Sequence, residues 1–156
     1  MLKRFFKRSF DILFSLFIML FVFSWLYPIL AILIKLESAG PVFFVQIRTG
    51  RNNRNFKCYK FRSMYVNGDA DKRQATLNDH RITQIGCFMR KTSLDELPQF
   101  FNVLIGNMSI VGPRPHMVVH TEEYSQLTEK YKARHTLRPG ITGWAQILGL
   151  RGEVKS

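Results

Sequence analysis

The stretch ILFSLFIMLFVFSWLYPILAILI, residues 12–34, decides the fold of this chain. Its 23 residues carry no charge and are interrupted only by Ser15, Ser24 and Pro28. About 20 consecutive apolar residues are enough to cross a bilayer as a helix. The stretch therefore predicts a membrane-embedded helix. A cleavable signal peptide is disfavoured because the apolar run is too long and no small-residue cleavage site follows it.

The charges on either side of this stretch disagree with a simple crossing. Basic residues lie on both flanks, and the positive-inside rule then places both ends on the cytoplasmic side: Lys3, Arg4, Lys7 and Arg8 precede the stretch, and Lys35, Arg48, Arg51, Arg54, Lys57, Lys60 and Arg62 follow it. Pro28 supplies a bend, because its ring clashes with the carbonyl of Ser24, whose hydroxyl can satisfy part of the disturbed backbone. We expect residues 1–36 to form a re-entrant, kinked helix, with a spanning helix as the alternative.

The remaining residues, 37–156, are expected to form one small globular body of α+β type. The chain has 23 basic and 11 acidic residues, a formal net charge of +12. Such an excess favours polyanionic partners, such as nucleic acid, acidic lipid head groups or phosphorylated metabolites, without choosing among them. Cys58 and Cys87 form no CxxC or zinc-type pattern and are interpreted as reduced thiols of a cytosolic body.

Two apolar, β-branched and aromatic runs predict a short β-hairpin. Residues 42–47 and 56–62 are the expected strands, and the polar residues 48–55 form the loop between them. Alternate residues of a strand share a face, so Lys60 and Arg62 are expected to point the same way. This face carries basic groups toward a site or a membrane surface.

Residues 65–84 are polar and without a clear period, which indicates a long loop. Asp69 and Asp71 in it could bind a metal, but no calcium-loop pattern surrounds them and solvated loop acids are the favoured interpretation. His116 and His120 stand four residues apart, a spacing that suits a metal, yet no third ligand is apparent. A surface helix is expected over residues 122–134.

The clearest helix predicted in the body runs from Ser93 to Ile105. The Ser93-to-Glu96 sequence matches a capping box, and Gly106-Asn107 is typical of a helix stop. One apolar face at helical spacing is expected to point inward, namely Leu94, Leu97, Phe101, Leu104 and Ile105.

Asp95 and Glu96 lie in the first turn of this predicted helix. Carboxylates there are stabilised by the helix dipole, so helix capping alone can explain them. Two adjacent helical residues point about 100° apart, however, and cannot both serve one cap. With Arg90 and Lys91 just before them, the position is suited to binding anions. A carboxylate held ionised there could attack phosphorus or bind a magnesium ion that bridges phosphate oxygens, and both roles indicate phosphoryl transfer.

Arg114 lies between rigid neighbours in the sequence Gly112-Pro113-Arg114-Pro115. A guanidinium whose backbone is fixed can bind a phosphate with little loss of conformational entropy. The motifs of P-loop NTPases, dinucleotide-binding folds, zinc metalloproteases and serine hydrolases are missing from the sequence. These enzyme classes therefore lack support.

Taken together, these segments resemble the bacterial sugar transferases, the monotopic phosphoglycosyl transferases. The matching motifs occur in the family's order: the apolar N-terminal segment, GPVFF (40–44), YKFRSM (59–64), TSLDELPQ (92–99), VGPRP (111–115) and PGITGWAQ (139–146). The resemblance implies transfer of a sugar 1-phosphate from a UDP-sugar to a polyprenyl phosphate, with release of UMP. It places the enzyme on the cytoplasmic face of the bacterial inner membrane, where it initiates exopolysaccharide, capsule or O-antigen synthesis.

The resemblance also implies roles for individual residues. Asp95 would be the nucleophile that forms a phosphosugar intermediate, and Glu96, beside Asp95, would bind Mg²⁺. Phosphate-binding roles fall on Arg90 and Arg114, and Lys60 and Arg62 are added as candidate substrate-binding residues from the strand pattern. The family's re-entrant helix is hinged at a Ser-Pro pair, whereas Tyr27 precedes Pro28 here, which leaves Ser24 to assist the kink.

The family also continues beyond the Trp-Ala-Gln motif, so the chain is expected to be truncated at its C-terminus. The expected partners are a UDP-sugar, polyprenyl phosphate and one leaflet of the membrane, but no nucleic acid. A second copy of the chain, in a homo-oligomer, is left open as a further partner. The alternative function is a membrane-anchored polyanion-binding module, in which Asp95 and Glu96 only cap a helix.

Overall fold

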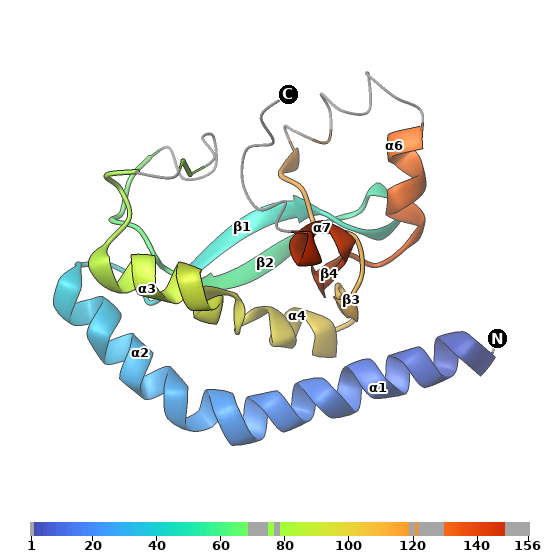
Figure 1. Ribbon diagram of the computed structural model, residues 1–156, viewed down its shortest axis with the longest axis horizontal. Coiled ribbons are helices and arrows are strands. Elements are labelled where there is room, and N and C mark those ends of the chain that lie inside the picture. The colour runs from blue at the N-terminus through green and yellow to red at the C-terminus, as the bar shows by residue number, and fades with distance from the viewer. Residues whose placement is uncertain (1, 69–74, 77–78, 119–120, 122–129, 149–156) are drawn as a thin grey trace.

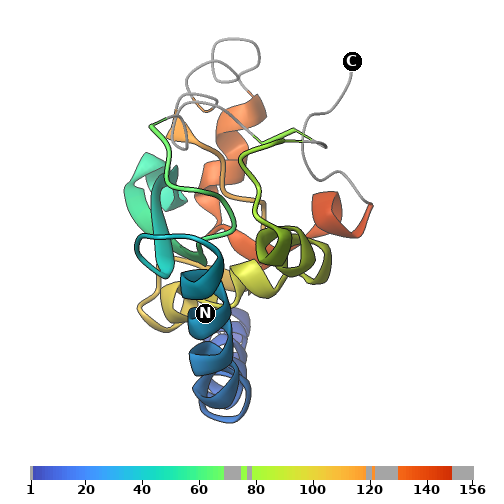
Figure 2. The same cartoon turned by 90° about the vertical axis from the view of Figure 1, so that its left-hand side faces the viewer.

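The computed structural model describes residues 2–68, 75–76, 79–118, 121 and 130–148. In these parts a long N-terminal helical segment lies along one side of a small body made of helices and short strands (Figure 1). The view from the side shows the same arrangement, with the helical segment outside the body rather than running through it (Figure 2). The mixed small domain with a long apolar helix and a short hairpin is the fold that the sequence predicts.

The helical segment consists of α1 (Leu2–Ile18), a π-helical turn (Met19–Phe23) and α2 (Ser24–Glu37). By length and composition this segment is able to cross a membrane, and only 11% of its most apolar window is buried against the body. Its outward surface is rich in large apolar side chains, which suits contact with lipid.

The helical segment changes direction between α1 and α2 (Figure 1). The π-helical turn lies at the change of direction, and Pro28 follows within α2. Both features are established causes of helix bending. Ser24 Oγ donates a 2.5 Å hydrogen bond to the carbonyl of Leu20 in the π-helical turn, and not to backbone next to Pro28. That the bend makes the segment re-entrant in a membrane stays a prediction.

The body is attached to α2 through an aromatic core. Leu30 and Ile34 of α2 are buried with Phe61 and Met89 of the body. Stacked rings continue the contact, with Phe61 lying 5.5 Å from Phe43 and 5.8 Å from Phe23 between ring centroids. Aromatic residues bury much area each, so this core fixes the body firmly on α2.

Two small sheets form the body. The predicted hairpin is confirmed, with β1 (Phe43–Thr49) antiparallel to β2 (Asn55–Phe61). A second, parallel pair joins β3 (Ser109–Val111) to β4 (Gly140–Thr142). The remaining short elements are α6 (Lys130–Ala133), a 3₁₀ turn (Arg134–Thr136) and α7 (Trp144–Ile147). Most of the predicted helix over residues 122–134 lies outside the described residues.

The single helix predicted over residues 93–105 is wrong. The structure has α3 (Gln84–Thr92), a 3₁₀ turn (Leu94–Glu96) and α4 (Gln99–Leu104) instead. Ser93 has a left-handed backbone (φ 59°) and is the C-cap of α3, and its side chain makes no capping bond to the 3₁₀ turn. The apparent capping box is therefore the end of one helix, because a residue in the left-handed region terminates the helix before it.

This break rotates the buried face of α4. Phe101 and Ile105, which were expected inside, are 44% and 50% exposed. Asn102 and Val103 are fully buried instead. The expected apolar face assumed one continuous period of 3.6 residues, and the 3₁₀ turn changes that phase. The predicted stop is confirmed, since α4 ends just before Gly106, whose φ is +90°.

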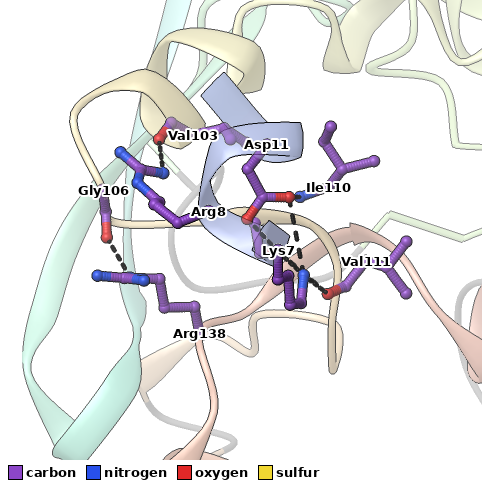
Figure 3. Close-up of polar contacts among 9 residues, drawn as sticks. Lys7, Arg8, Asp11, Val103, Gly106, Ile110, Val111 and Arg138 are labelled. Carbon is purple, nitrogen blue, oxygen red and sulfur yellow. Dashed lines mark hydrogen bonds and ion pairs between the residues drawn. The ribbon is translucent and has the colours of Figure 1, made fainter. Parts of the chain in front are cut away.

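Polar side chains of α1 bind the body directly (Figure 3). Arg8 donates hydrogen bonds of 2.7 and 2.9 Å to the carbonyls of Val103 and Leu104 at the C-terminal end of α4. A guanidinium at this end of a helix satisfies carbonyls that have no partner within the helix. One charged side chain thereby joins the membrane-facing helix to the element that follows Asp95 and Glu96.

Asp11 makes the second contact of α1, with β3. Its carboxylate accepts hydrogen bonds from the Ile110 amide (3.1 Å) and the Ser109 hydroxyl (2.8 Å) (Figure 3). Lys7 forms an ion pair with Asp11 at 3.7 Å and donates to the Val111 carbonyl at 3.1 Å. A buried carboxylate with this many partners is compensated for its lost hydration, so α1 is held on the body at a defined position.

Candidate functional site

Asp95 and Glu96 lie in the break between α3 and α4. The 3₁₀ turn that contains them is closed by a 3.1 Å hydrogen bond from the Glu96 amide to the Ser93 carbonyl. Asp95 is only 7% exposed, whereas the Glu96 side chain is 16% exposed. The pair therefore lies in a short 3₁₀ turn rather than at the N-terminus of a long α-helix.

Cations from two other parts of the chain meet at Glu96. Lys60 of β2 places its Nζ 2.8 Å from Glu96 Oε1. Arg114, from the loop after β3, places Nη2 3.4 Å from the same oxygen. The structure therefore brings together three of the residues that the sequence singles out, although they are far apart along the chain.

Burial dominates the electrostatics of Asp95. Loss of hydration raises the pKa of its carboxyl above the ordinary value, and the charge of Glu96 adds to this effect. Lys60, Arg90 and Arg114 lower the same pKa and oppose the shift. The expectation that the surroundings keep this carboxylate ionised is wrong in its net direction, because burial outweighs the cations and the pKa of Asp95 is raised.

Arg90 and Arg62 lie in different places relative to the pair. Arg90 is in the last turn of α3, where its Nε donates to the Ser63 hydroxyl at 2.9 Å while its charge acts on Asp95. Arg62 is buried and donates to the carbonyls of Ser38, at 2.7 Å, and Ala39. It joins the end of β2 to the end of α2, because β2 stops at Phe61 and the strand alternation does not reach Arg62.

The loop that carries Arg114 is fixed by the small parallel sheet. The Gly140 amide donates to the Pro113 carbonyl at 2.9 Å, and Arg134 Nη2 donates to the Arg114 carbonyl at 2.6 Å. At Gly112 a Cβ would lie 2.4 Å from the Arg138 carbonyl oxygen, so only glycine permits this close approach. The rigidity expected for this loop therefore comes from β3 and β4 as well as from its prolines.

A pocket opens beside the pair, and its lining adds residues that the sequence did not single out. Arg48, Cys58 and Gln99 line it with the expected Lys60, Glu96 and Arg114, together with Pro115 and Gly140. Burial raises the pKa of the Cys58 thiol, which keeps it in the neutral form. Arg48 lies two residues after Gln46, so the two side chains share a face of β1. Gln46 pairs with Cys58 across the hairpin, and this register would have placed Arg48 near the pocket.

The carboxylates present are compatible with a magnesium ion that is shared with a substrate. In the described part of the chain, no group of three or more His, Cys, Asp and Glu side chains could hold a metal alone. Mg²⁺ commonly uses one or two carboxylates and completes its shell with water and substrate phosphates. Asp69, Asp71 and His120 lie outside the described residues, and His116 bonds to the Tyr131 hydroxyl at 2.6 Å.

A buried carboxylate surrounded by lysine and arginine side chains is chemically suited to phosphate esters. The cations can neutralise phosphate oxygens, and Lys60, Arg90 and Arg114 all lie close enough to Asp95 to lower its pKa. The site lies on the body that packs against α1 and α2, and the outward surface of these two helices is apolar.

Comparison with known proteins agrees with a site suited to phosphate esters. The family model described as "Bacterial sugar transferase" matches residues 2–156. The chain is 54% identical over 153 residues to the UDP-glucose:undecaprenyl-phosphate glucose-1-phosphate transferase of Escherichia coli (strain K12), covering 97% of this chain and 33% of that protein. It is 48% identical over 145 residues to the UDP-N-acetylgalactosamine-undecaprenyl-phosphate N-acetylgalactosaminephosphotransferase of Aeromonas hydrophila, covering 92% and 34%.

This chain covers a larger share of a third relative. The exopolysaccharide production protein PSS of Rhizobium leguminosarum bv. phaseoli is 49% identical over 154 residues, which cover 94% of this chain and 75% of the relative. The chain spans about a third of the length of the other two relatives. The family match extends over nearly all of the sequence and includes every residue of the pocket. The chain belongs to the bacterial sugar transferase family.

Proposed function

We propose that this chain transfers a sugar 1-phosphate from a UDP-sugar to a polyprenyl phosphate such as undecaprenyl phosphate, releasing UMP. One observation carries the proposal: Asp95 and Glu96 are held among Lys60, Arg90 and Arg114. The relatives whose names state this reaction, with glucose or N-acetylgalactosamine as the sugar, match the chain over the same region.

In the first step, a carboxylate oxygen of Asp95 attacks the phosphorus that carries the sugar. The bond between this phosphorus and the oxygen that bridges the two phosphates breaks, and UMP leaves with that oxygen and its electron pair. The product on the protein is an aspartyl phosphosugar, an acyl phosphate. Lys60 and Arg114 would neutralise the charge that accumulates on the phosphate oxygens.

In the second step, an oxygen of the polyprenyl phosphate attacks the same phosphorus. The acyl phosphate bond breaks and Asp95 regains its carboxylate, while the sugar leaves as a polyprenyl diphosphate derivative. Both steps displace a group at the same phosphorus atom. Because Asp95 is buried, the acyl phosphate formed on it is protected from attack by water.

We propose that Glu96 would bind a magnesium ion, with Asp95 as a second carboxylate ligand. The ion would supply positive charge to the diphosphate of the donor. The exposure of Glu96 to the pocket supports this assignment, as does the presence of a second carboxylate one residue away. Arg90, in the last turn of α3, donates to the Ser63 hydroxyl, and its charge lowers the pKa of Asp95.

The acceptor requires a site at the membrane surface. We propose that residues 1–36 enter the cytoplasmic leaflet and return, and that the body stands on the cytoplasmic face of the bacterial inner membrane. The outward apolar surface of α1 and α2, the bend between them and the basic residues at both ends support this topology. In this position the site can meet the phosphate of a lipid whose tail stays in the bilayer.

The test is UMP release and covalent labelling with the full chain in detergent or nanodiscs. UDP-glucose and UDP-N-acetylgalactosamine are offered with Mg²⁺, and intact-mass measurement detects a phosphosugar on the protein. We expect Asp95→Asn to abolish the adduct and to lower UMP release by about 10⁴-fold or more, the scale of losing a nucleophile.

Asp79→Asn is the matched control, because it makes the same chemical change outside the site. The Asp79 side chain is only 5% exposed and is paired with Arg81 at 2.6 Å, so its loss tests whether destabilisation alone removes activity. UMP release by Asp95→Asn at the original rate would defeat the nucleophile assignment. Salt-sensitive polyanion binding with no UMP release and no need for magnesium would instead identify a membrane-anchored binding module.

A further inference from the structure

The hairpin of β1 and β2 carries apolar side chains on both faces. One face bears Phe56 and Cys58, which are buried in the core of the body. The other face bears Val45 and Ile47, which are 42% and 46% exposed. An antiparallel sheet that packs on a core with one face usually has polar side chains on the other, because that other face meets water. The apolar side chains here indicate a different surrounding.

The exposed face of the hairpin continues onto α4. Tyr59 lies opposite Val45 in the hairpin register, and its ring centroid is 5.7 Å from that of Phe101. Ile105 follows Phe101 by four residues and lies on the same side of the helix. The sequence predicted both of these side chains to be buried, and both are exposed. We call Val45, Ile47, Tyr59, Phe101 and Ile105 the hairpin–α4 strip.

The hairpin–α4 strip lies next to both helices of the membrane segment. On the hairpin, the same strand face ends at Phe61, whose ring centroid lies 5.8 Å from that of Phe23 at the end of the π-helical turn. On α4, the residue before Phe101 is Phe100, whose ring centroid lies 6.1 Å from that of Phe14 in α1. A membrane that takes up α1, α2 and the turn between them is therefore within reach of the strip.

The charges beside the strip suit the head groups of acidic lipids. Lys57 is exposed and lies opposite Ile47 in the hairpin register. Arg51 and Arg54, in the turn that joins the two strands, are exposed as well, and residues 38–68 contain no acidic residue. Basic side chains next to an apolar surface are typical of elements that lie in the interface of an anionic membrane.

We propose that the hairpin–α4 strip is a second membrane-contact surface, which rests at the boundary between the head groups and the acyl chains of the bilayer. Val45, Ile47 and Phe101 contact the upper part of the acyl chains, while Lys57 reaches the lipid phosphates. Contact through both the helical segment and the strip fixes how the body is oriented on the membrane. The inference rests on the membrane location proposed for residues 1–36 and not on the transfer reaction.

The test places an environment-sensitive NBD label at single cysteines of the full chain, in nanodiscs of phosphatidylcholine and phosphatidylglycerol without polyprenyl phosphate. The exposed native Cys87 is replaced by serine, and Cys58 is buried. We expect labels at Val45→Cys and Phe101→Cys to emit at shorter wavelength than in water, and to lose intensity when the lipids carry a doxyl quencher close to the head group. A quencher at the end of the acyl chain should act more weakly, because the strip lies at the interface.

Val66 provides the matched control, because it is an exposed valine of the body outside the strip. A label at Val66→Cys should keep the emission of an aqueous environment and resist the quencher. Val45→Asp should reduce the quenching of the label at Phe101→Cys, because a carboxylate is costly to place among acyl chains, whereas Val66→Asp should leave that quenching unchanged. Both aspartate variants should keep the melting temperature in detergent, since both positions are exposed.

The contrary outcomes are distinct from failure of the proposed function. Labels at Val45 and Phe101 that behave like the label at Val66 overturn the contact surface, even if transfer activity is normal. Quenching that begins only when polyprenyl phosphate is added would assign the strip to the tail of the acceptor and also overturn it. Disulfide-linked dimers of Val45→Cys without quenching would make the strip an interface between copies, with the same consequence. Quenched labels on a chain that releases no UMP from any UDP-sugar would keep the contact surface and reject the transferase.

Discussion

At the scale of single residues, Asp95 combines two opposing demands. A nucleophile must be ionised, but its burial raises its pKa, and Lys60, Arg90 and Arg114 offset only part of this effect. The fold therefore holds a carboxylate that is less stable in its ionised form than an exposed one. Perturbed groups of this kind are typical of functional sites.

The pH dependence of the first step follows from these neighbours. The rate of adduct formation should fall with decreasing pH as Asp95 is protonated, with the acid limb above the ordinary carboxyl value of 3.8. Lys60→Met removes a charge that lowers this pKa, so the limb should move to higher pH. Glu96→Gln removes a charge that raises it, so the limb should move to lower pH. Single-turnover rates between pH 4 and 9 measure both, and shifts in the same direction would contradict this account.

The same burial predicts that the inactive variant is the more stable one. Since the folded pKa of Asp95 is raised, its contribution to stability is full below the unfolded value of 3.8 and is lost as pH rises through the folded value. Asn mimics the protonated acid at every pH. Asp95→Asn should therefore raise the melting temperature at pH 7 and change it less at pH 4. A lower melting temperature at pH 7 would show that the cations outweigh the burial.

At the scale of elements, the site depends on how α4 is joined to β2. Asn102 is fully buried, and its Oδ1 accepts from the Tyr59 amide at 3.0 Å while Nδ2 donates to the Lys57 carbonyl at 2.7 Å. These bonds tie the helix that follows Asp95 and Glu96 to the strand that carries Lys60. The Asn102 side chain thus sets the distance of Asp95 and Glu96 from Lys60.

Removal of this amide should damage both stability and the site. Asn102→Ala empties a fully buried position and takes these partners from the part-buried Tyr59 amide and Lys57 carbonyl, so we expect a loss of about 2–4 kcal/mol in unfolding free energy. Gln84→Ala, which truncates an exposed amide, is the control and should change stability by less than about 0.5 kcal/mol. Denaturant titration measures both. Equal effects of the two substitutions would show that Asn102 does not join α4 to β2.

At the scale of the whole molecule, the membrane segment and the site form one unit. Arg8 binds the end of α4 and Asp11 binds β3, which leads directly into the Arg114 loop (Figure 3). Polar side chains that would be costly in lipid are therefore used against the body. The arrangement supports a segment that lies along the body and leaves only its apolar surface for the bilayer.

The topology can be tested with single cysteines. In a re-entrant arrangement, position 3 and the body lie on the same side of the membrane. Lys3→Cys, in a Cys87→Ser background, should resist an impermeant maleimide on intact spheroplasts and react after permeabilisation, as the exposed native Cys87 should in the unmodified chain. Labelling of Lys3→Cys from outside, with Cys87 protected, would establish a spanning helix instead.

The sequence by itself predicted the apolar segment, the hairpin, the site pair and the basic residues around it. These features depend on local patterns: an uncharged run of 23 residues, two strand-forming runs, and adjacent carboxylates beside Arg90 and Lys91. Hydrophobic length and strand alternation are properties of neighbouring residues, so they can be read without a structure. The family resemblance rested on the same short motifs and is confirmed by the match over residues 2–156.

Only the tertiary structure decided where the helices break and which cations meet the acids. Ser93 has the local pattern of a helix start, but its left-handed backbone ends α3. The start of α3 is capped by Thr83 instead, whose hydroxyl accepts from the Gly86 amide at 2.9 Å. Arg62 and Lys60 have the same local pattern, yet one bonds to the end of α2 and the other to Glu96. Contacts between residues 18 to 104 positions apart depend on packing, which no local pattern encodes.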